Sequence, residues 1–217
     1  MPTVTTRPIE PGSCALIVGN GPSGLSRKWP LVWRWVGRQR GALPDVCLIN
    51  WSALGPTTPR YAVACDTDVL RTFRDSGLQN RTIIVCNSVE NTCGPDSAPE
   101  RLDDLFPAES CILGRNEWPP LASGPLAAWM MTALGYETIL LYALDGTARP
   151  FDGDHSQEMG RRAKTWERLI CRHLEARADG DGKPKLVRVW PKSDIPNLVQ
   201  SGADPLASAI DGTILAP

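Results

Sequence analysis

The chain has 217 residues, of which 42% are hydrophobic and 22% are charged, a composition typical of a globular protein and not of a disordered one. This length suits one sizeable domain, and we expect residues 1–217 to form a single domain. The 23 basic and 24 acidic residues leave a formal net charge of −1, which gives no long-range attraction to nucleic acids or anionic membranes.

Apolar runs and cysteines narrow the class of protein. No apolar run is long enough to span a bilayer, and residues 1–11 lack the apolar core of a secretory signal. The seven cysteines form no C-x-x-C pair and the chain has two histidines, which argues against a structural zinc site and a disulfide framework. We therefore expect a cytoplasmic protein with reduced thiols and no membrane span, while the oligomeric state stays unknown.

Four short apolar runs bounded by turn residues lie in the first half of the chain, at 14–18, 46–49, 61–65 and 82–86. None shows a clean alternation of polar and apolar residues, which is typical of parallel strands covered on both faces. Residues 25–40 are compatible with a helix, in which Pro30 must lie in the first turn or cause a break. Trp29 and Trp33 stand four residues apart and are expected to pack against the sheet.

The middle of the chain combines an irregular segment with a clear helix–strand unit. Residues 87–120 contain many prolines and polar residues, which indicates a mobile connection with one short helix near 100–105. A helix is expected over 126–134, because Pro125 precedes it and Gly135 follows it. A strongly apolar strand is expected over 138–144.

The last third begins with a polar loop, the lid, at about 146–156. A long helix over 157–178 with apolar residues at helical spacing, a strand over 186–190 and a short helix over 195–200 are expected next, and the tail from 201 is expected to be loosely structured. Because strands and helices alternate, we predict an α/β fold: a doubly wound, mostly parallel, Rossmann-like sheet flanked by helices, in a single domain with a short lid.

The strand at 14–18 runs directly into a glycine-rich turn. Its residues are Gly19, Asn20, Gly21, Pro22, Ser23 and Gly24. Closely spaced glycines let backbone N–H groups approach a phosphate, and the amide of Asn20 and the hydroxyl of Ser23 can add hydrogen bonds. The spacing matches neither common phosphate-loop pattern, so a plain strand-to-helix turn stays an alternative.

Gly-Asn-Gly-Pro-Ser after a first strand resembles the opening of the bacterial sialyltransferases that use CMP-sialic acid. It is also similar to the related archaeal-type 6-hydroxymethylpterin pyrophosphokinase-like proteins, which are often encoded in phages and prophages. A second block at 121–145, Leu-Ala-Ser-Gly-Pro through Ala-Leu-Gly-Tyr to Ala-Leu-Asp, resembles a block of the same family. The resemblance spans roughly residues 14–190 and implies a nucleotide pocket lined by Ser123 and Gly124, with Asp145 at the end of the following strand.

Two further positions fit this resemblance. The family places an asparagine after its second strand and a polar group after its third, and Asn50 and Asp66 stand at these places. Open α/β sheets bind ligands at the carboxyl ends of their strands. The nucleotide-binding set is therefore predicted to include Asn50 and Asp66, although a turn asparagine remains an alternative for Asn50.

The lid holds the candidate catalytic groups. The resemblance to sialyltransferases implies that a lid histidine acts as base on the acceptor hydroxyl, which assigns this role to His155, with Asp154 beside it. The lid lacks the two tyrosines of that family, so Arg149, Arg161 or Arg162 is an alternative group for neutralising phosphate charge. The second alternative is Mg²⁺ held by carboxylates of the lid region, namely Asp145, Asp152 and Asp154.

The resemblance implies a transferase that binds a nucleotide-sugar or other nucleotide donor and moves a sugar to an acceptor hydroxyl. One alternative is an ATP- and Mg²⁺-dependent pyrophosphokinase of the hydroxymethylpterin type, and another is a non-catalytic protein that sequesters a nucleotide. A nucleic-acid acceptor rests only on residues 27–40, which carry five basic residues and no acidic one. The identity of base, sugar and acceptor does not follow from the sequence.

Overall fold

A computed structural model of the protein describes residues 13–19, 29–50, 53, 57–86, 101–107, 110, 112–113, 123–144, 184–191 and 212–216. The chain divides into two compact units. Unit 1 consists of Met1–Glu10 and Val46–Ala127, and unit 2 consists of Pro11–Asp45 and Ala128–Pro217. The expectation of one domain over residues 1–217 stays a prediction.

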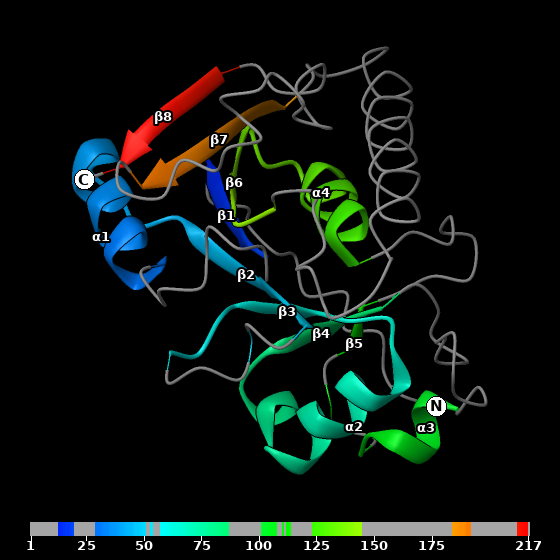
Figure 1. The fold of residues 1–217 in the computed structure, drawn as a ribbon. Helices are drawn as coiled ribbons and strands as arrows, with labels where there is room; N and C mark the ends of the chain where they lie inside the picture. The colour runs from blue at the N-terminus through cyan, green and yellow to red at the C-terminus, as the bar shows by residue number, and fades with distance from the viewer. Residues whose placement is uncertain are drawn as a thin grey trace, which may run out of the picture. The chain divides into compact units, whose positions relative to one another are not determined.

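Unit 2 contains a parallel arrangement of four strands in the order β1-β6-β7-β8 (Figure 1). Their bounds are β1 Cys14–Val18, β6 Thr138–Tyr142, β7 Lys185–Pro191 and β8 Gly212–Ala216. The register places Val18 opposite Tyr142, and Tyr142 opposite Val189, so these strands end at a common carboxyl edge. The helix α1, Trp29–Arg40, also belongs to this unit.

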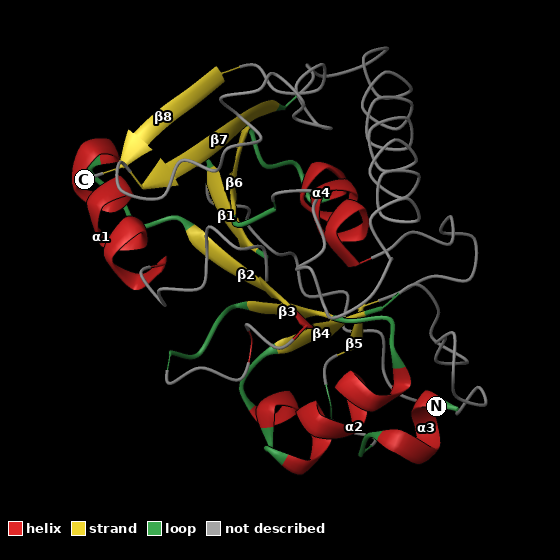
Figure 2. Cartoon of the chain, in the orientation of Figure 1, coloured by secondary structure: helices red, strands yellow, loops and turns green. Residues whose placement is uncertain are grey.

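Unit 1 carries the parallel order β2-β3-β4-β5. The strands are β2 Asp45–Ile49, β3 Tyr61–Val63, β4 Ile83–Val85 and β5 Ile112–Leu113, and the short helices are α2 Thr67–Asp75, the 3-10 turn η3 Leu78–Asn80 and α3 Leu102–Leu105. The helix α4, Ser123–Ala133, is drawn in red in Figure 2, and its residues up to Ala127 belong to unit 1. Ile49, Val63 and Val85 stand opposite one another and define the carboxyl edge of this unit.

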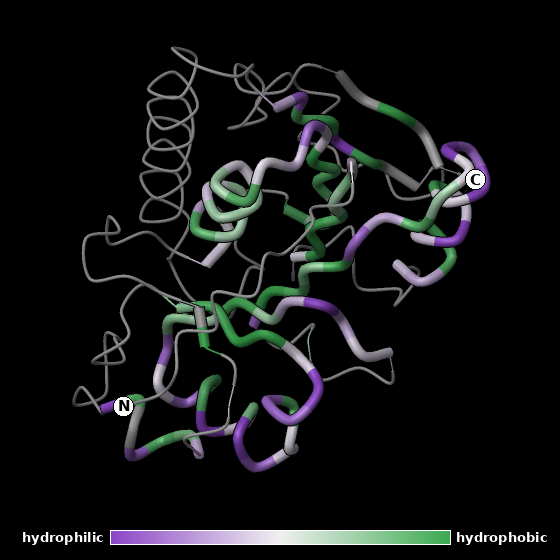
Figure 3. The backbone as a smooth tube through the Cα atoms, turned by 180° about the vertical axis from the view of Figure 1, so that it is seen from behind, coloured by the Kyte–Doolittle hydropathy of each residue, from purple (hydrophilic) through white to green (hydrophobic). Residues whose placement is uncertain are grey.

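The core of each unit is built from its strands, which are drawn mainly as hydrophobic in Figure 3. All five residues of β1 are buried, and so are the last four residues of β2 and of β6. This burial on both faces explains why the strands lack polar–apolar alternation. Tyr136, Tyr142, Tyr61 and Phe73 are among the largest fully buried side chains of the described residues.

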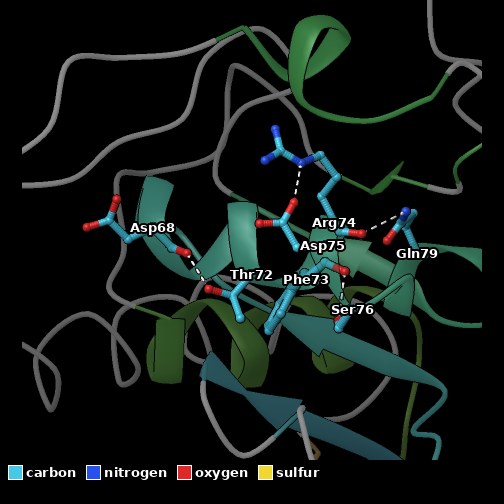
Figure 4. Close-up of polar contacts among 7 residues, drawn as sticks. All are labelled: Asp68, Thr72, Phe73, Arg74, Asp75, Ser76 and Gln79. Atoms are coloured by element: carbon cyan, nitrogen blue, oxygen red, sulfur yellow. Dashed lines mark hydrogen bonds and ion pairs between the residues drawn. The ribbon is translucent and has the colours of Figure 1, made fainter.

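The helix α2 shows how local sequence sets one element. Val69, Leu70 and Phe73 lie on one side of the helix and are buried, while its charged residues are paired at the surface. The helix ends at Ser76, whose hydroxyl donates to the Phe73 carbonyl at 2.9 Å (Figure 4). Gly77 follows with φ of 68°, a left-handed conformation that glycine adopts without strain.

The structure confirms the predicted α/β class with a parallel, Rossmann-like sheet flanked by helices. The strands at 14–18, 46–49 and 186–190 are found within one residue of their predicted ends. The predictions at 61–65, 82–86 and 138–144 are each one or two residues too long at one or both ends. The expected helices at 157–178 and 195–200 lie outside the described residues.

Three features differ from the expectations. The helix α4 begins at Ser123, three residues before the predicted start, because Pro125 lies inside its first turn, where proline needs no N–H partner. Residues 212–216 of the tail form β8, which pairs with β7, so the expectation of a loosely structured tail is wrong there. The helix α2 and the strand β5 were not expected at all.

The described helices include none that is both long enough and apolar enough to cross a membrane.

Candidate functional site

Asn50 directly follows β2 at the carboxyl edge of unit 1. Its φ of 50° lies in the left-handed region, which asparagine tolerates better than other non-glycine residues. The residue is half-buried, and its side-chain oxygen Oδ1 is shielded from water without a hydrogen-bond partner among the described residues. A shielded oxygen of this kind costs free energy unless a donor reaches it. Asn50 therefore presents an acceptor that a bound hydroxyl or amino group would satisfy.

Asp66 lies at the same edge, three residues after the end of β3. Ile49 stands opposite Val63, so the segments that carry Asn50 and Asp66 leave adjacent strands side by side. Asp66 is half-buried at the N-cap position of α2, yet its carboxylate makes no capping hydrogen bond; its backbone carbonyl instead accepts from Leu70 N–H at 3.1 Å. The edge thus combines the amide oxygen of Asn50 with the carboxylate of Asp66, a residue that also has an interaction of its own within the protein.

The acceptor oxygen of Asn50 favours a ligand that donates a hydrogen bond. The hydroxyls of a ribose and the amino group of a base are donors, whereas an ionised phosphate offers acceptors. An acidic residue at the carboxyl edge of a parallel sheet is also the usual partner of a ribose in dinucleotide-binding folds. This part of unit 1 suits the nucleoside end of a nucleotide, not its phosphates.

Gly19 lies at the carboxyl edge of unit 2, directly after β1. Its N–H donates to the Tyr142 carbonyl at 2.8 Å, so this amide is not available to a phosphate. A Cβ at this position would overlap the Ala143 carbonyl oxygen and lie 2.8 Å from a methyl carbon of Leu144. The glycine is therefore required by packing between two strand ends, and its assignment to nucleotide binding stays a prediction.

Ala143 is the neighbour that makes this glycine necessary. It follows β6 with φ of 55°, an unusual conformation for alanine, and it is buried. The turn places the Ala143 carbonyl next to Gly19. No pattern in the sequence signals this strained position, because alanine has no special preference for it.

Ser123 and Gly124 form the first residues of α4, and both are buried. Ser123 is 6% exposed, which leaves little of its side chain for a ligand in this structure. The amino end of an eleven-residue helix attracts negative charge through its free N–H groups. Their place at a helix start is compatible with the predicted role, which stays a prediction.

The other predicted site residues lie outside the described residues. They are Asn20, Gly21, Pro22 and Ser23 of the glycine-rich turn, and Asp145, Asp152, Asp154 and His155 of the lid region. Within the described ranges, no group of three or more His, Cys, Asp or Glu side chains could hold a metal ion. The magnesium ligands predicted at 145, 152 and 154 are therefore untested.

The buried thiols of β1 and β2 do not suit nucleophilic catalysis. Burial raises the pKa of the Cys47 thiol far above its ordinary value of 9.0. Burial also raises the pKa of Cys14; Arg40 opposes this effect and Asp45 adds to it. Because the thiolate is the nucleophile, neutral buried thiols of this kind act as small apolar core residues.

The fold and the polar strand ends define the chain as an α/β protein of the Rossmann-like class with a candidate ligand site at the carboxyl edge of its parallel strands. No protein-family model and no curated protein matches the sequence. One solved structure with a similar backbone is "Structure of Rhizobium etli pyruvate carboxylase T882A crystallized without acetyl coenzyme-A", with 11% sequence identity and a TM-score of 0.28. The match covers 94% of this chain and 19% of that one, and a likeness this weak carries no argument.

Proposed function

We propose that the protein is a transferase that binds a nucleotide-activated donor, most simply a nucleotide-sugar, and moves the sugar to an acceptor hydroxyl. The observation that carries the proposal is the shielded Oδ1 of Asn50, beside the Asp66 loop, which has no hydrogen-bond partner among the described residues. This oxygen is suited to accept from a hydroxyl of the ribose or an amino group of the base. The resemblance of residues 19–23 and 121–145 to sialyltransferases supports the same assignment.

In the proposed reaction the bond between the sugar carbon and the donor phosphate breaks, and a bond from that carbon to the acceptor oxygen forms. The phosphate leaves with the bonding electrons, and His155 takes the proton of the acceptor hydroxyl. A histidine suits this step because its ordinary pKa lies near neutral pH. Asn50 and Asp66 hold the nucleoside and do not take part in the bond changes.

Thermal shift measurements test donor binding. The panel consists of CMP, CMP-sialic acid, UDP- and GDP-sugars, ATP and GTP, each with and without Mg²⁺. A ligand at about 100 times its dissociation constant stabilises the folded state by about 2.7 kcal/mol, which raises the midpoint by several degrees. A shift with a nucleotide-sugar that does not need Mg²⁺ supports the glycosyltransferase. A shift only with ATP and Mg²⁺ supports the pyrophosphokinase instead, and no shift with any ligand overturns donor binding.

Variants at Asn50 test whether the ligand that causes the thermal shift binds at this residue. Asn50→Gly accepts the left-handed backbone but lacks the acceptor, so we expect a normal midpoint without ligand and a clearly smaller ligand shift. Asn50→Asp keeps an acceptor oxygen and should keep most of the shift. The matched control is Asn80→Gly, since Asn80 is exposed and precedes β4 at the opposite edge of unit 1. Equal shifts in all three variants would remove Asn50 from the site.

Catalysis is tested separately from binding. His155→Ala should bind the donor with an unchanged thermal shift but lose most sugar transfer to an acceptor. Transfer that persists at the wild-type rate would exclude His155 as the base. Binding of the intact donor, with no transfer by the wild-type protein to any of a panel of sugar and alcohol acceptors, would favour the sequestering protein.

A further inference from the structure

The helix α1 of unit 2 has two different faces. Trp29, Val32 and Val36 share one face and are buried in the unit. Four residues spaced i, i+3, i+4 and i+7 share the opposite face, and we call them the outer stripe. The outer stripe consists of Leu31, Arg34, Trp35 and Arg38.

The outer stripe mixes apolar with basic groups, and three of its four residues are exposed to solvent. Leu31 is 63% exposed, which makes it one of the exposed large hydrophobic residues of the described chain. Arg34 and Arg38 are exposed, and Trp35 is half-buried. An exposed leucine next to a partly exposed tryptophan keeps apolar area in water, which a bound partner would remove.

Trp29 and Trp33, the other two tryptophans of α1, make side-chain contacts that Trp35 lacks within the described ranges. The rings of Trp29 and Trp33 contact each other, with centroids 6.4 Å apart and a tilt of 53°. Trp33 Nε1 donates to the Pro44 carbonyl at 2.9 Å. The indole of Trp35 makes no hydrogen bond or ring contact with another residue of the described ranges. The ring contact and the hydrogen bond of Trp33 thus have no counterpart at Trp35 within these ranges.

The charge of the outer stripe is not compensated within the described part of the chain. The helix α1 contains no acidic residue, and neither Arg34 nor Arg38 forms an ion pair with a described residue. The helix α2 of unit 1 provides the contrast. Arg71 pairs with Asp68 at 3.1 Å and Arg74 pairs with Asp75 at 2.8 Å, the second pair being drawn in Figure 4.

We propose that the outer stripe of α1 binds single-stranded nucleic acid. Arg34 and Arg38 stand about 6 Å apart along the helix axis and contact successive phosphates. Trp35 and the side chain of Leu31 provide an apolar surface on which one base stacks, the combination found in proteins that bind single strands without sequence preference. This inference goes beyond the proposed transferase and does not rest on it.

Single strands fit the stripe better than duplexes or membranes. A duplex keeps its bases stacked, so it offers no free base face to Trp35. A membrane-bound helix turns a broad apolar face to the lipid. The broad apolar face of α1 is buried in its own unit, and the outer stripe carries arginines between its two apolar residues.

Fluorescence anisotropy with a labelled, mixed-sequence DNA single strand of about 20 nucleotides tests the proposal on the full chain. Binding is measured over a series of salt concentrations. The double variant Arg34→Gln/Arg38→Gln should bind about tenfold more weakly near 0.1 M salt, and the slope of log K against log salt should fall by about 1.4, since each phosphate contact on a single strand contributes about 0.7. The matched control Arg71→Gln/Arg74→Gln removes the same charge from α2 and should change neither value.

Trp35 is tested by two substitutions. Trp35→Ala should weaken binding at least about fivefold with an unchanged salt slope, and Trp35→Phe should retain most of the affinity because a base still stacks on the ring. Thermal midpoints check that all variants are folded.

Four outcomes overturn the proposal: no binding of the single strand, an equal effect of both arginine pairs, tighter binding of the matching duplex, or binding of anionic lipid vesicles in place of DNA. Failure here with an intact nucleotide shift leaves the transferase proposal standing. Single-strand binding without a nucleotide shift would leave this inference standing and overturn donor binding by the proposed transferase.

Discussion

In unit 2 the carboxyl edge of the sheet is closed by backbone contacts, because the Gly19 amide donates to Tyr142 and the Gly19 Cα lies against the Ala143 carbonyl. In unit 1 the corresponding edge ends in polar side chains, Asn50 and Asp66. Each edge includes a left-handed residue directly after a strand, Ala143 at 55° and Asn50 at 50°. The same backbone conformation thus serves packing in one unit and displays a hydrogen-bond acceptor in the other.

The largest expected effect on stability comes from a substitution at Gly19, in the carboxyl edge of unit 2. Gly19→Ala should lower the free energy of unfolding by about 3 kcal/mol, since the new methyl group meets a backbone carbonyl that has no room to move. Urea denaturation measures this loss. The control Gly41→Ala has free space around the new Cβ but a φ of 73°, so its cost is backbone strain alone, about 1 kcal/mol. Equal losses in the two variants would refute the steric explanation for Gly19.

Within unit 2, a side-chain contact joins Tyr136, which precedes β6, to Asp45, the first residue of β2, which belongs to unit 2. The Tyr136 hydroxyl donates to Asp45 Oδ2 at 2.6 Å, and Tyr136 is 2% exposed. Tyr136→Phe should cost about 2 kcal/mol, the range found for hydrogen bonds to charged groups. A double-mutant cycle with Asp45→Ala isolates the interaction, and a coupling energy near zero would show that the contact does not stabilise the fold.

The thiol of Cys47, in the strand β2 that precedes Asn50, reports whether water reaches this part of unit 1. Burial raises the pKa of Cys47, so above the ordinary value of 9.0 the thiol ionises in the unfolded chain but not in the folded one. The contribution of the neutral Cys47 thiol to the free energy of unfolding is fully present below pH 9. At higher pH it falls by up to about 1.4 kcal/mol per pH unit. Cys47→Ala should flatten the decline of the free energy of unfolding between pH 9 and 10. An unchanged decline would mean that water reaches the thiol.

The smallest expected effect on stability comes from a substitution at Ala143, one of the two left-handed residues compared above. Ala143→Gly should stabilise the protein by about 0.5 to 1 kcal/mol, because relief of the left-handed strain exceeds the added entropy of the unfolded chain. Chemical denaturation of the variant and the wild type measures the gain. A loss of stability would show that the Ala143 methyl group contributes packing that outweighs the strain.

Strong apolar runs made most of the fold predictable. The strands β1 and β2 consist mainly of buried apolar residues, and Leu186, Val187 and Val189 of β7 are buried too, so the type and place of these strands follow from the sequence. The helix α2 carried an amphipathic signal, with Val69, Leu70 and Phe73 on one side, that the prediction did not use. The strand β5 has two residues, too few for any pattern, and the short apolar run of β8 was not recognised as a strand.

The candidate site was predictable in part. Asn50 and Asp66 were predicted from the family resemblance and from their places after two expected strands, and the structure places both at one edge of unit 1, while their role stays a prediction. What the sequence does not contain is the reason for Gly19, which depends on Ala143, a residue more than a hundred positions away, and on the conformation of that residue. Glycine patterns report where side chains do not fit, and they do not say whether a ligand or the protein itself fills the space.

The close contact between Gly19 and the Ala143 carbonyl separates two kinds of selection on this protein. A mutational scan that selects only for cellular abundance should already reject every substitution at Gly19. The same scan should tolerate glycine or aspartate at Asn50, and only a second selection for ligand binding should distinguish them. A gene copy that no longer served any catalytic purpose would therefore keep Gly19 for as long as it kept folding, while Asn50 would be free to drift.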